Sequence, residues 1–218
     1  MTYNGITFIM TACNRPDLTA RTLESFFRLT EHQGNEPFIV HIDGMDAEVV
    51  RVVQVYPWIK IIGSTERVGL AVSLDKLMAE VQTEYVFSME DDWYFAGNPF
   101  FLAQCVTLLT HMRCDQVWVR DLRDHEHPTT TNFPKVCDYV PYYEIAKKYQ
   151  GHWGGFSFNP SMRRTADYKR LFPNGYAEFG DEADCSRHVE RIGYRALSLS
   201  NGACTHIGWN RHTEGFRV

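Results

Sequence analysis

The chain of 218 residues is long enough for one globular domain with a buried core, and its 44% hydrophobic and 22% charged residues are typical of a soluble protein. The formal net charge of −5 excludes a chain-wide basic surface for nucleic acid, while a local basic groove stays compatible with it. No apolar run predicts a membrane span or a secretory signal, and six scattered cysteines without a C-x-x-C pair predict reduced thiols in a cytoplasmic protein.

The first half of the chain alternates short apolar runs with amphipathic segments. We predict strands at residues 6–10, 38–42, 59–63, 85–89 and 116–120. Helices are predicted from Asn14-Pro16 onward and at residues 47–55, 70–81 and 98–112. Strands that alternate with helices through short connections form right-handed βαβ units, so the sequence predicts an α/β fold with a parallel sheet.

The second half has a different pattern. Residues 121–150 are polar and contain prolines, which predicts a loop, and residues 151–158 are rich in glycine and aromatic side chains, which predicts a strand. Helices are predicted at 159–171 and 181–192, and extended segments at 194–199 and 203–207. Arg163 and Arg164 are expected on the solvated face of the first of these helices. No segment has the composition of a linker between domains.

Acidic side chains follow two of the predicted strands. Asp43 ends one strand, and Glu90, Asp91 and Asp92 follow another. Because ligands of parallel sheets bind beyond the carboxyl ends of the strands, these acids are candidates for a binding site. Carboxylates two residues apart in extended backbone suit a divalent ion that carries phosphates. The alternative interpretation is a solvated acidic turn.

A second acidic group, Asp181-Glu182-Ala183-Asp184, begins a predicted helix. Asp181 and Asp184 fit the role of capping residues, whereas Glu182 is free to act as a general base. His206 is either a packed histidine or a metal ligand. The glycines around Trp153 permit close approach of the backbone to a ligand, or a tightly packed strand.

The order of these motifs along the chain resembles the nucleotide-sugar glycosyltransferases of the GT-A fold, in particular family two. The motifs are Thr11-Ala12-Cys13-Asn14-Arg15, Asp43-Gly44, Arg67-Val68-Gly69-Leu70, Glu90-Asp91-Asp92, Gly180-Asp181-Glu182, Gly193-Tyr194-Arg195 and His206. The resemblance covers residues 5–208. It implies one α/β GT-A domain over residues 1–218 with a mostly parallel central sheet flanked by helices. A Rossmann-like nucleotide half would span about residues 1–120, and an acceptor half with the catalytic base about residues 121–218.

The resemblance also implies roles for particular residues. The expected nucleotide-sugar-binding residues are Thr11, Asn14, Arg15, Asp43, Arg67, Glu90 and Asp91. Asp92 and His206 would hold Mn²⁺ or Mg²⁺. Glu182 is the favoured base, and Asp181 stays open because the Asp-Glu order inverts the family's Glu-Asp pair. The expected acceptor-binding residues are Trp93, Trp153, Gly154 and Gly155. Asp75 stands where many relatives carry asparagine, so a diphosphate contact there is in doubt.

The expected activity is therefore metal-dependent sugar transfer, with inversion, from a nucleoside-diphosphate sugar to an acceptor hydroxyl. A UDP-sugar donor and a glycan acceptor are favoured. A modified nucleic-acid base or a protein as acceptor, a nucleotidyltransferase, and a non-catalytic nucleotide-sugar binder are the alternatives. The expected location is the cytoplasm, which would be the host cytoplasm for a viral protein.

Overall fold

The computed structural model describes residues 5–124, 130, 133–145, 155–209 and 211. The helices are α1 (Pro16–Thr30), α2 (Ala47–Val53), α3 (Leu70–Glu80), α4 (Phe101–His111), α5 (Thr165–Leu171) and α6 (Glu182–Arg191). The strands are β1 (Ile6–Ala12), β2 (Phe38–Asp43), β3 (Ile59–Ser64), β4 (Tyr85–Glu90), β5 (Trp93–Phe95), β6 (Gln116–Trp118), β7 (Lys135–Cys137), β8 (Val140–Glu144), β9 (Ser161–Arg164), β10 (Ala196–Leu199) and β11 (Cys204–His206). The predicted α/β class is confirmed.

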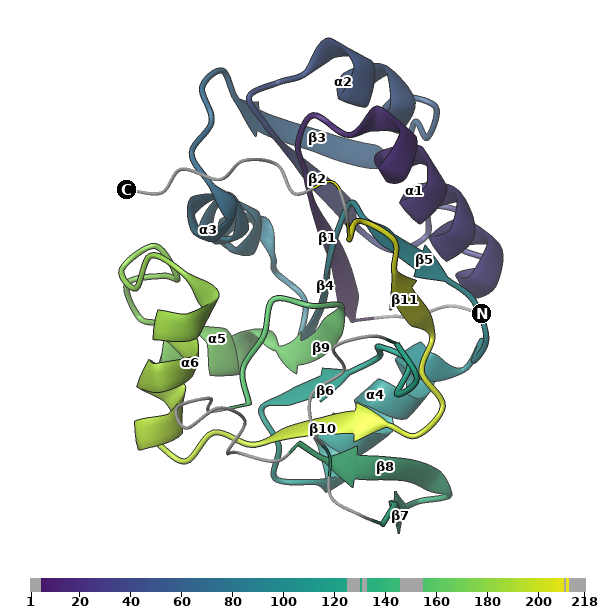
Figure 1. Ribbon diagram of the computed structural model, residues 1–218, viewed down its shortest axis with the longest axis vertical. Coiled ribbons are helices and arrows are strands. Elements are labelled where there is room, and N and C mark those ends of the chain that lie inside the picture. The colour runs from purple at the N-terminus through teal and green to yellow at the C-terminus, as the bar shows by residue number, and fades with distance from the viewer. Residues whose placement is uncertain (1–4, 125–129, 131–132, 146–154, 210, 212–218) are drawn as a thin grey trace.

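A nine-stranded sheet in the order β3-β2-β1-β4-β9-β6-β10-β8-β7 runs through the molecule (Figure 1). Its first four strands are parallel, as the alternation of strands and helices predicts. All seven residues of β1 are buried, because this strand lies inside the sheet with helices on both faces. The carboxyl ends of β1, β2 and β4 therefore meet at one edge.

Beyond β4 the sheet is mixed. β9 lies antiparallel between β4 and β6, while β10 is parallel to β6. Three predictions for this half are wrong. Residues 159–171 form β9 followed by α5 instead of one helix; residues 135–144 form the β7–β8 hairpin; and residues 155–158 are not a strand. The antiparallel pairing of β9 on both sides overrides the local helix signal of Asn159-Pro160.

Two hydrophobic clusters cover the two faces of the sheet. On one face, α1, α2 and α4 pack on the sheet through a group of phenylalanines: Phe8, Phe26, Phe38, Phe87, Phe95 and Phe101. On the other face, α3, α5 and α6 pack on the sheet, with Phe156, Phe172 and Tyr176 between them. Each fully buried phenylalanine contributes about 1.5–3 kcal/mol through burial. The same sheet thus supports the segments packed on both of its faces.

A small two-stranded sheet joins the end of the chain to the acidic strand end. β11 pairs antiparallel with β5, which places His206 opposite Trp93. In Figure 1, β11 runs beside β5 on the α1 side of the molecule. This pairing places His206, near the end of the chain, next to the residues that directly follow β4.

None of the six cysteines, all of which lie in the described ranges, forms a disulfide. The described helices include none that is both long and apolar enough to cross a bilayer.

Candidate active site

The first acidic cluster, defined as Glu90, Asp91 and Asp92, begins at the last residue of β4. Arg15 bridges its two aspartates: Nη2 contacts Asp91 Oδ1, and Nη1 lies 2.6 Å from Asp92 Oδ2. Asp91 Oδ2 also accepts hydrogen bonds from the backbone N–H of Cys13 (3.1 Å) and the hydroxyl of Thr19 (3.3 Å). The structure therefore uses Asp91 to attach the loop after β1 to the end of β4.

His206 lies beside the remaining aspartate. Its Nε2 is 3.1 Å from Asp92 Oδ2, while Asp92 Oδ1 is buried and has no hydrogen-bond partner among the described residues. The described ranges hold no group of three or more His, Cys, Asp or Glu residues arranged around a metal site. One carboxylate and one imidazole, with an unsatisfied buried oxygen, nevertheless fit a divalent ion that takes its other ligands from phosphate and water.

Burial and neighbouring charges shift the pKa values of the three carboxyl groups in different directions. The pKa of Glu90 is raised to about 8, chiefly by burial. The carboxylates of Asp92 and Glu182 add to this effect, and that of Asp91 adds less. Burial raises the pKa of Asp91 to about 6 against the opposing charge of Arg15. Burial also acts on Asp92, but the His206 hydrogen bond and Arg15 outweigh it and hold the Asp92 pKa below its usual value. Among the three carboxyl groups, Asp92 is thus the one whose surroundings favour the charged form.

The second acidic cluster, defined as Asp181, Glu182 and Asp184, lies at the start of α6. Asp181 is the N-cap, and its Oδ1 accepts a hydrogen bond from the backbone N–H of Asp184 at 2.8 Å. Glu182 points away from this cap. Its Oε2 accepts hydrogen bonds from Ser157 Oγ (3.0 Å) and from the backbone N–H of Phe158 (2.8 Å). The two neighbouring acids therefore have different structural surroundings.

Burial raises the pKa of Glu182, and the Phe158 N–H, the Ser157 hydroxyl and the charges of Arg163 and Arg120 offset only part of that effect. Because Glu182 acts electrostatically on Glu90, the two acidic clusters lie within range of each other.

The other predicted donor residues lie at the carboxyl ends of the parallel strands. Asp43 accepts hydrogen bonds from the backbone N–H groups of Val68 (2.7 Å) and Gly69 (3.0 Å), so it holds the loop that leads into α3. Arg67 belongs to this loop, and a Cβ on Gly44 would lie 3.2 Å from its side chain. Thr11 pairs with Glu90 in the sheet register.

Asn14 is exposed and adopts a left-handed backbone conformation (φ 51°), directly before Arg15. A left-handed residue at this position turns the chain from β1 into α1 and lets the following arginine reach the acidic cluster. The nucleotide-binding roles of these residues stay predictions.

Residues 7–172 match the family model described as glycosyl transferase family 2. The chain belongs to glycosyl transferase family 2. A comparison with curated protein sequences finds no match.

Solved structures share the fold. The mannosyltransferase PcManGT from Pyrobaculum calidifontis, in complex with GDP-Man and Mn²⁺, is 18% identical with a TM-score of 0.63, covering 95% of this chain and 58% of that one. S. aureus TarS is 14% identical with a TM-score of 0.68, covering 92% of this chain and 36% of that one. Residues 1–349 of TarS in complex with UDP-GlcNAc are 12% identical with a TM-score of 0.62, covering 96% and 60%. The chain thus spans about three fifths or less of the length of these glycosyltransferases.

Within this family-two fold, Asp75 has a role that its sequence context does not reveal. Its Oδ1 accepts hydrogen bonds from the Tyr168 hydroxyl (2.9 Å) and the backbone N–H of Tyr176 (2.7 Å), and Oδ2 accepts one from Ala177 N–H (2.9 Å). Asp75 lies on α3, so it connects this helix to the loop before α6. Its carboxylate accepts these three hydrogen bonds from the protein itself, so it does not point toward a diphosphate.

Arg163 also differs from its predicted place. It is buried on β9 instead of lying on a solvated helix face. It donates to the Tyr176 hydroxyl and to the carbonyl oxygen of Ser157, both at 2.6 Å, and its guanidinium stacks on Phe156. Since Ser157 is a hydrogen-bond donor to Glu182, Arg163 fixes the loop that holds this carboxylate. The Arg163-Arg164 dipeptide alone gives no signal for such burial.

Two predicted acceptor residues, Trp153 and Gly154, lie outside the described residues. Trp93 is 1% exposed, and its ring contacts the ring of His206 with centroids 5.0 Å apart. A buried ring has no face for a sugar, so the assignment of Trp93 to the acceptor is corrected to a packing role beside the acidic cluster. Gly155 is buried with φ 86°, next to Ile145 and Ala196, and its acceptor role stays a prediction.

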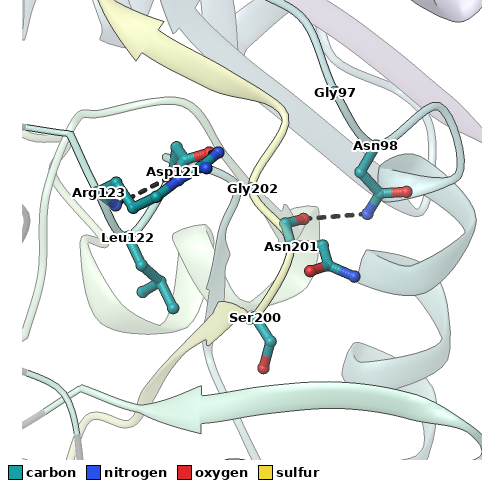
Figure 2. Close-up of a pocket in the computed structure, with 8 residues that line it drawn as sticks. All are labelled: Gly97, Asn98, Asp121, Leu122, Arg123, Ser200, Asn201 and Gly202. Carbon is teal, nitrogen blue, oxygen red and sulfur yellow. Dashed lines mark hydrogen bonds and ion pairs between the residues drawn. The ribbon is translucent and has the colours of Figure 1, made fainter.

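A cavity of about 530 Å³ lies elsewhere, and none of the predicted site residues lines it. It is lined by Gly97, Asn98, Asp121, Leu122, Arg123, Ser200, Asn201 and Gly202. Figure 2 shows the paired Asp121 and Arg123 on one side, and Asn98 bonded to the carbonyl oxygen of Asn201 on the other. Its charged groups satisfy each other, so it offers no reactive constellation comparable to the two acidic clusters.

Proposed function

We propose that the protein is a metal-dependent, inverting glycosyltransferase that moves a sugar from a nucleoside-diphosphate sugar to an acceptor hydroxyl. The observation that carries this proposal is the environment of Glu182. Its carboxylate is partly buried, accepts hydrogen bonds from neutral donors, and lies within electrostatic range of Glu90 at the end of β4. Such a carboxylate suits a general base.

The donor would occupy the edge formed by β1, β2 and β4. Asp92 and His206 would hold Mn²⁺ or Mg²⁺ there, and Asp43, Arg67, Thr11, Asn14, Arg15, Glu90 and Asp91 would surround the nucleotide. The bound ion supplies positive charge next to the diphosphate leaving group. GDP-Man and UDP-GlcNAc in the two similar structures support a nucleotide-sugar donor, and we favour a UDP-sugar for this chain.

In the proposed reaction, Glu182 accepts the proton of the acceptor hydroxyl as its oxygen bonds to the anomeric carbon. The bond from that carbon to the diphosphate oxygen breaks, and its electron pair leaves with the nucleoside diphosphate. Attack and departure occur on opposite faces of the sugar, so the configuration inverts. The exposed Asp181 is occupied as a helix cap, which supports Glu182 over Asp181 as the base.

We favour a glycan as acceptor and the cytoplasm as location, the latter because six unpaired thiols suit a reducing compartment. The test is an assay of nucleoside-diphosphate release from UDP-, GDP- and dTDP-sugars, each with and without Mn²⁺, with sugar acceptors present. We expect release from one donor class only when Mn²⁺ is added. The anomeric proton coupling of the product reports inversion. No release from any donor, or transfer of the nucleotide instead of the sugar, contradicts the proposal.

A further inference from the structure

A buried arginine, Arg120, contacts the ring of Trp93, the residue that follows the first acidic cluster, and acts electrostatically on Glu182 of the second. It follows β6, where the chain runs beside β11: the backbone N–H of Asp121 donates to the carbonyl oxygen of Cys204 at 2.8 Å. A Cβ on Gly202 would overlap the backbone of Asp121, so this close approach requires glycine. Arg120 therefore lies beside β11, the strand that contains His206.

Arg120 forms a buried ion pair with Asp124. Arg120 Nε lies 2.8 Å from Asp124 Oδ2, and the two side chains are only 6% and 7% exposed. Taking both charges out of water costs free energy that the attraction offsets only with good geometry and further hydrogen bonds. The same Asp124 Oδ2 accepts a hydrogen bond from the backbone N–H of His206 at 2.9 Å. The ion pair is thus attached to the backbone of His206.

The guanidinium of Arg120 also contacts the two indoles that flank His206. Its central carbon lies 5.2 Å from the Trp93 ring and 5.4 Å from the Trp209 ring. Those rings contact the imidazole of His206, with centroid distances of 5.0 Å and 4.5 Å. Backbone and imidazole of His206 are therefore both held by groups that Arg120 touches.

We propose that Arg120 and Asp124 form a positioning pair that holds His206 beside Asp92, where the donor diphosphate and its divalent ion bind. This inference rests on the proposed function. Asp124 fixes the backbone of His206 through one hydrogen bond, and Arg120 fixes Asp124 and the Trp93–Trp209 pair. The positive charge of Arg120 also acts on Glu182, so the same residue influences both sides of the site.

The test compares Asp124→Ala with Asp167→Ala. Asp167, on α5, forms ion pairs with Arg164 of β9 (2.7 Å; exposures 28% and 14% for Arg164 and Asp167) and with Arg170 (3.1 Å). It has no contact with His206 among the described residues, so it is the matched control for general destabilisation. Calorimetric titration with UDP and with GDP, each with and without Mn²⁺, measures the binding. Removing an outer partner of a metal ligand costs about 10–100-fold in metal affinity. We expect D124A to lose about tenfold in Mn²⁺-dependent nucleotide affinity, while D167A retains it.

A second readout does not depend on the proposed function. Amide hydrogen exchange at His206 should become faster in D124A, because its N–H loses its acceptor, and should stay unchanged in D167A. Asp124→Asn, which keeps an acceptor oxygen, and Arg120→Lys, which keeps the charge but not the planar contact with the indoles, should give intermediate effects and remain folded if D124A does not. Wild-type exchange at His206 in D124A or D124N overturns the positioning role. Wild-type protein that binds neither nucleotide contradicts the proposed function instead.

Discussion

The two acidic clusters are built from the same kind of side chain, yet the protein treats them differently. Asp91 is 1% exposed, and a guanidinium, a backbone N–H and a hydroxyl surround its carboxylate. Glu182 accepts its hydrogen bonds from a hydroxyl and a backbone N–H, both neutral. A cation thus contacts the first carboxylate directly, whereas the positive charges of Arg163 and Arg120 have only a minor effect on the second.

This difference separates structural carboxylates from chemical ones. Protonation of Asp91, whose pKa burial raises to about 6, would remove one of the two carboxylate charges that hold Arg15 in place. Glu182 forms no ion pair among the described residues, so it can take up a proton without breaking one. We therefore propose anchoring for Asp91 and proton transfer for Glu182, and substitutions in the two clusters should separate these roles.

Glu182→Gln removes the proposed base while keeping an oxygen that accepts the hydrogen bonds of Ser157 and Phe158. General base catalysis contributes roughly 10²–10⁴-fold, so we expect kcat to fall by about that factor. Nucleotide affinity should be retained, because the change does not touch the first acidic cluster. The measurements are steady-state kinetics with the donor that supports nucleotide release, and calorimetric titration with its nucleotide.

The matched control is Asp181→Asn, one residue away. Asparagine is also a good N-cap, so this variant should retain most of its turnover. A large loss of kcat in D181N with nearly normal turnover in E182Q would exchange the roles of the two acids.

Asp91→Asn tests the anchoring role. It leaves Arg15 with one carboxylate partner in a site where the side chains are 11% and 1% exposed. Breaking a buried pair in this way costs about 3–5 kcal/mol, so we expect the free energy of unfolding to fall by that amount in urea denaturation. Asp17→Asn breaks the exposed Asp17–Arg211 pair and should cost less than about 1 kcal/mol. If D91N and D17N lost the same free energy of unfolding, Asp91 would contribute no more to stability than an exposed surface charge.

The pH dependence gives a third test. Because burial raises the pKa of Glu182, the acid limb of kcat/KM should lie above the ordinary glutamate value of 4.5, with activity rising as the pH rises and Glu182 ionises. For stability the sign is opposite. Between the unfolded and the raised folded pKa, the folded state holds a proton that the unfolded state releases, so the free energy of unfolding falls as pH rises.

Glu182→Gln should remove the contribution of this group to both pH profiles. Kinetics and urea denaturation over the same pH range measure them. An acid limb centred at the ordinary glutamate value, or a stability profile that is identical in E182Q, would show that the buried state of Glu182 is not what the structure indicates.

The parallel half of the fold is predictable from the sequence because each of its strands and helices is a local pattern with a short connection. The two acidic groups are predictable as well, since their positions after a strand and at a helix start follow from spacing. Strand β9 is not predictable in this way, because Ser161–Arg164 pairs with one strand on each side, β4 and β6, and both pairings depend on residues far away in the sequence. The burial of Arg163 follows from that same missed strand.

The residues around the clusters are harder still to predict. Arg120 and Asp124 stand in or beside a polar segment with the composition of a loop, and only the pairing of that segment with β11 makes them neighbours of His206. From the sequence alone, Asp75 reads as a substitution of the asparagine that many relatives carry, at a position expected to contact the diphosphate. Its backbone partners come from residues about 100 positions later in the chain, and no local pattern indicates them.

That connection by Asp75 gives the smallest of the expected effects. Gly175 has φ 90°, and a Cβ there would lie 2.5 Å from the Asp75 carboxylate. Gly175→Ala therefore combines left-handed strain with displacement of the carboxylate that holds the loop before α6. Gly193 has φ 79°, and a Cβ there would meet nothing within 4 Å, so Gly193→Ala isolates the strain, about 1–2 kcal/mol.

We expect G175A to lose more free energy of unfolding than G193A, by about 1 kcal/mol for a displaced buried hydrogen bond, and to lower kcat as well. G193A should leave kcat unchanged. Urea denaturation and steady-state kinetics of the two variants measure the difference. Equal stability and equal kcat would mean that the contact of Asp75 on α3 does not affect the position of Glu182, and that the two clusters are placed by the sheet alone.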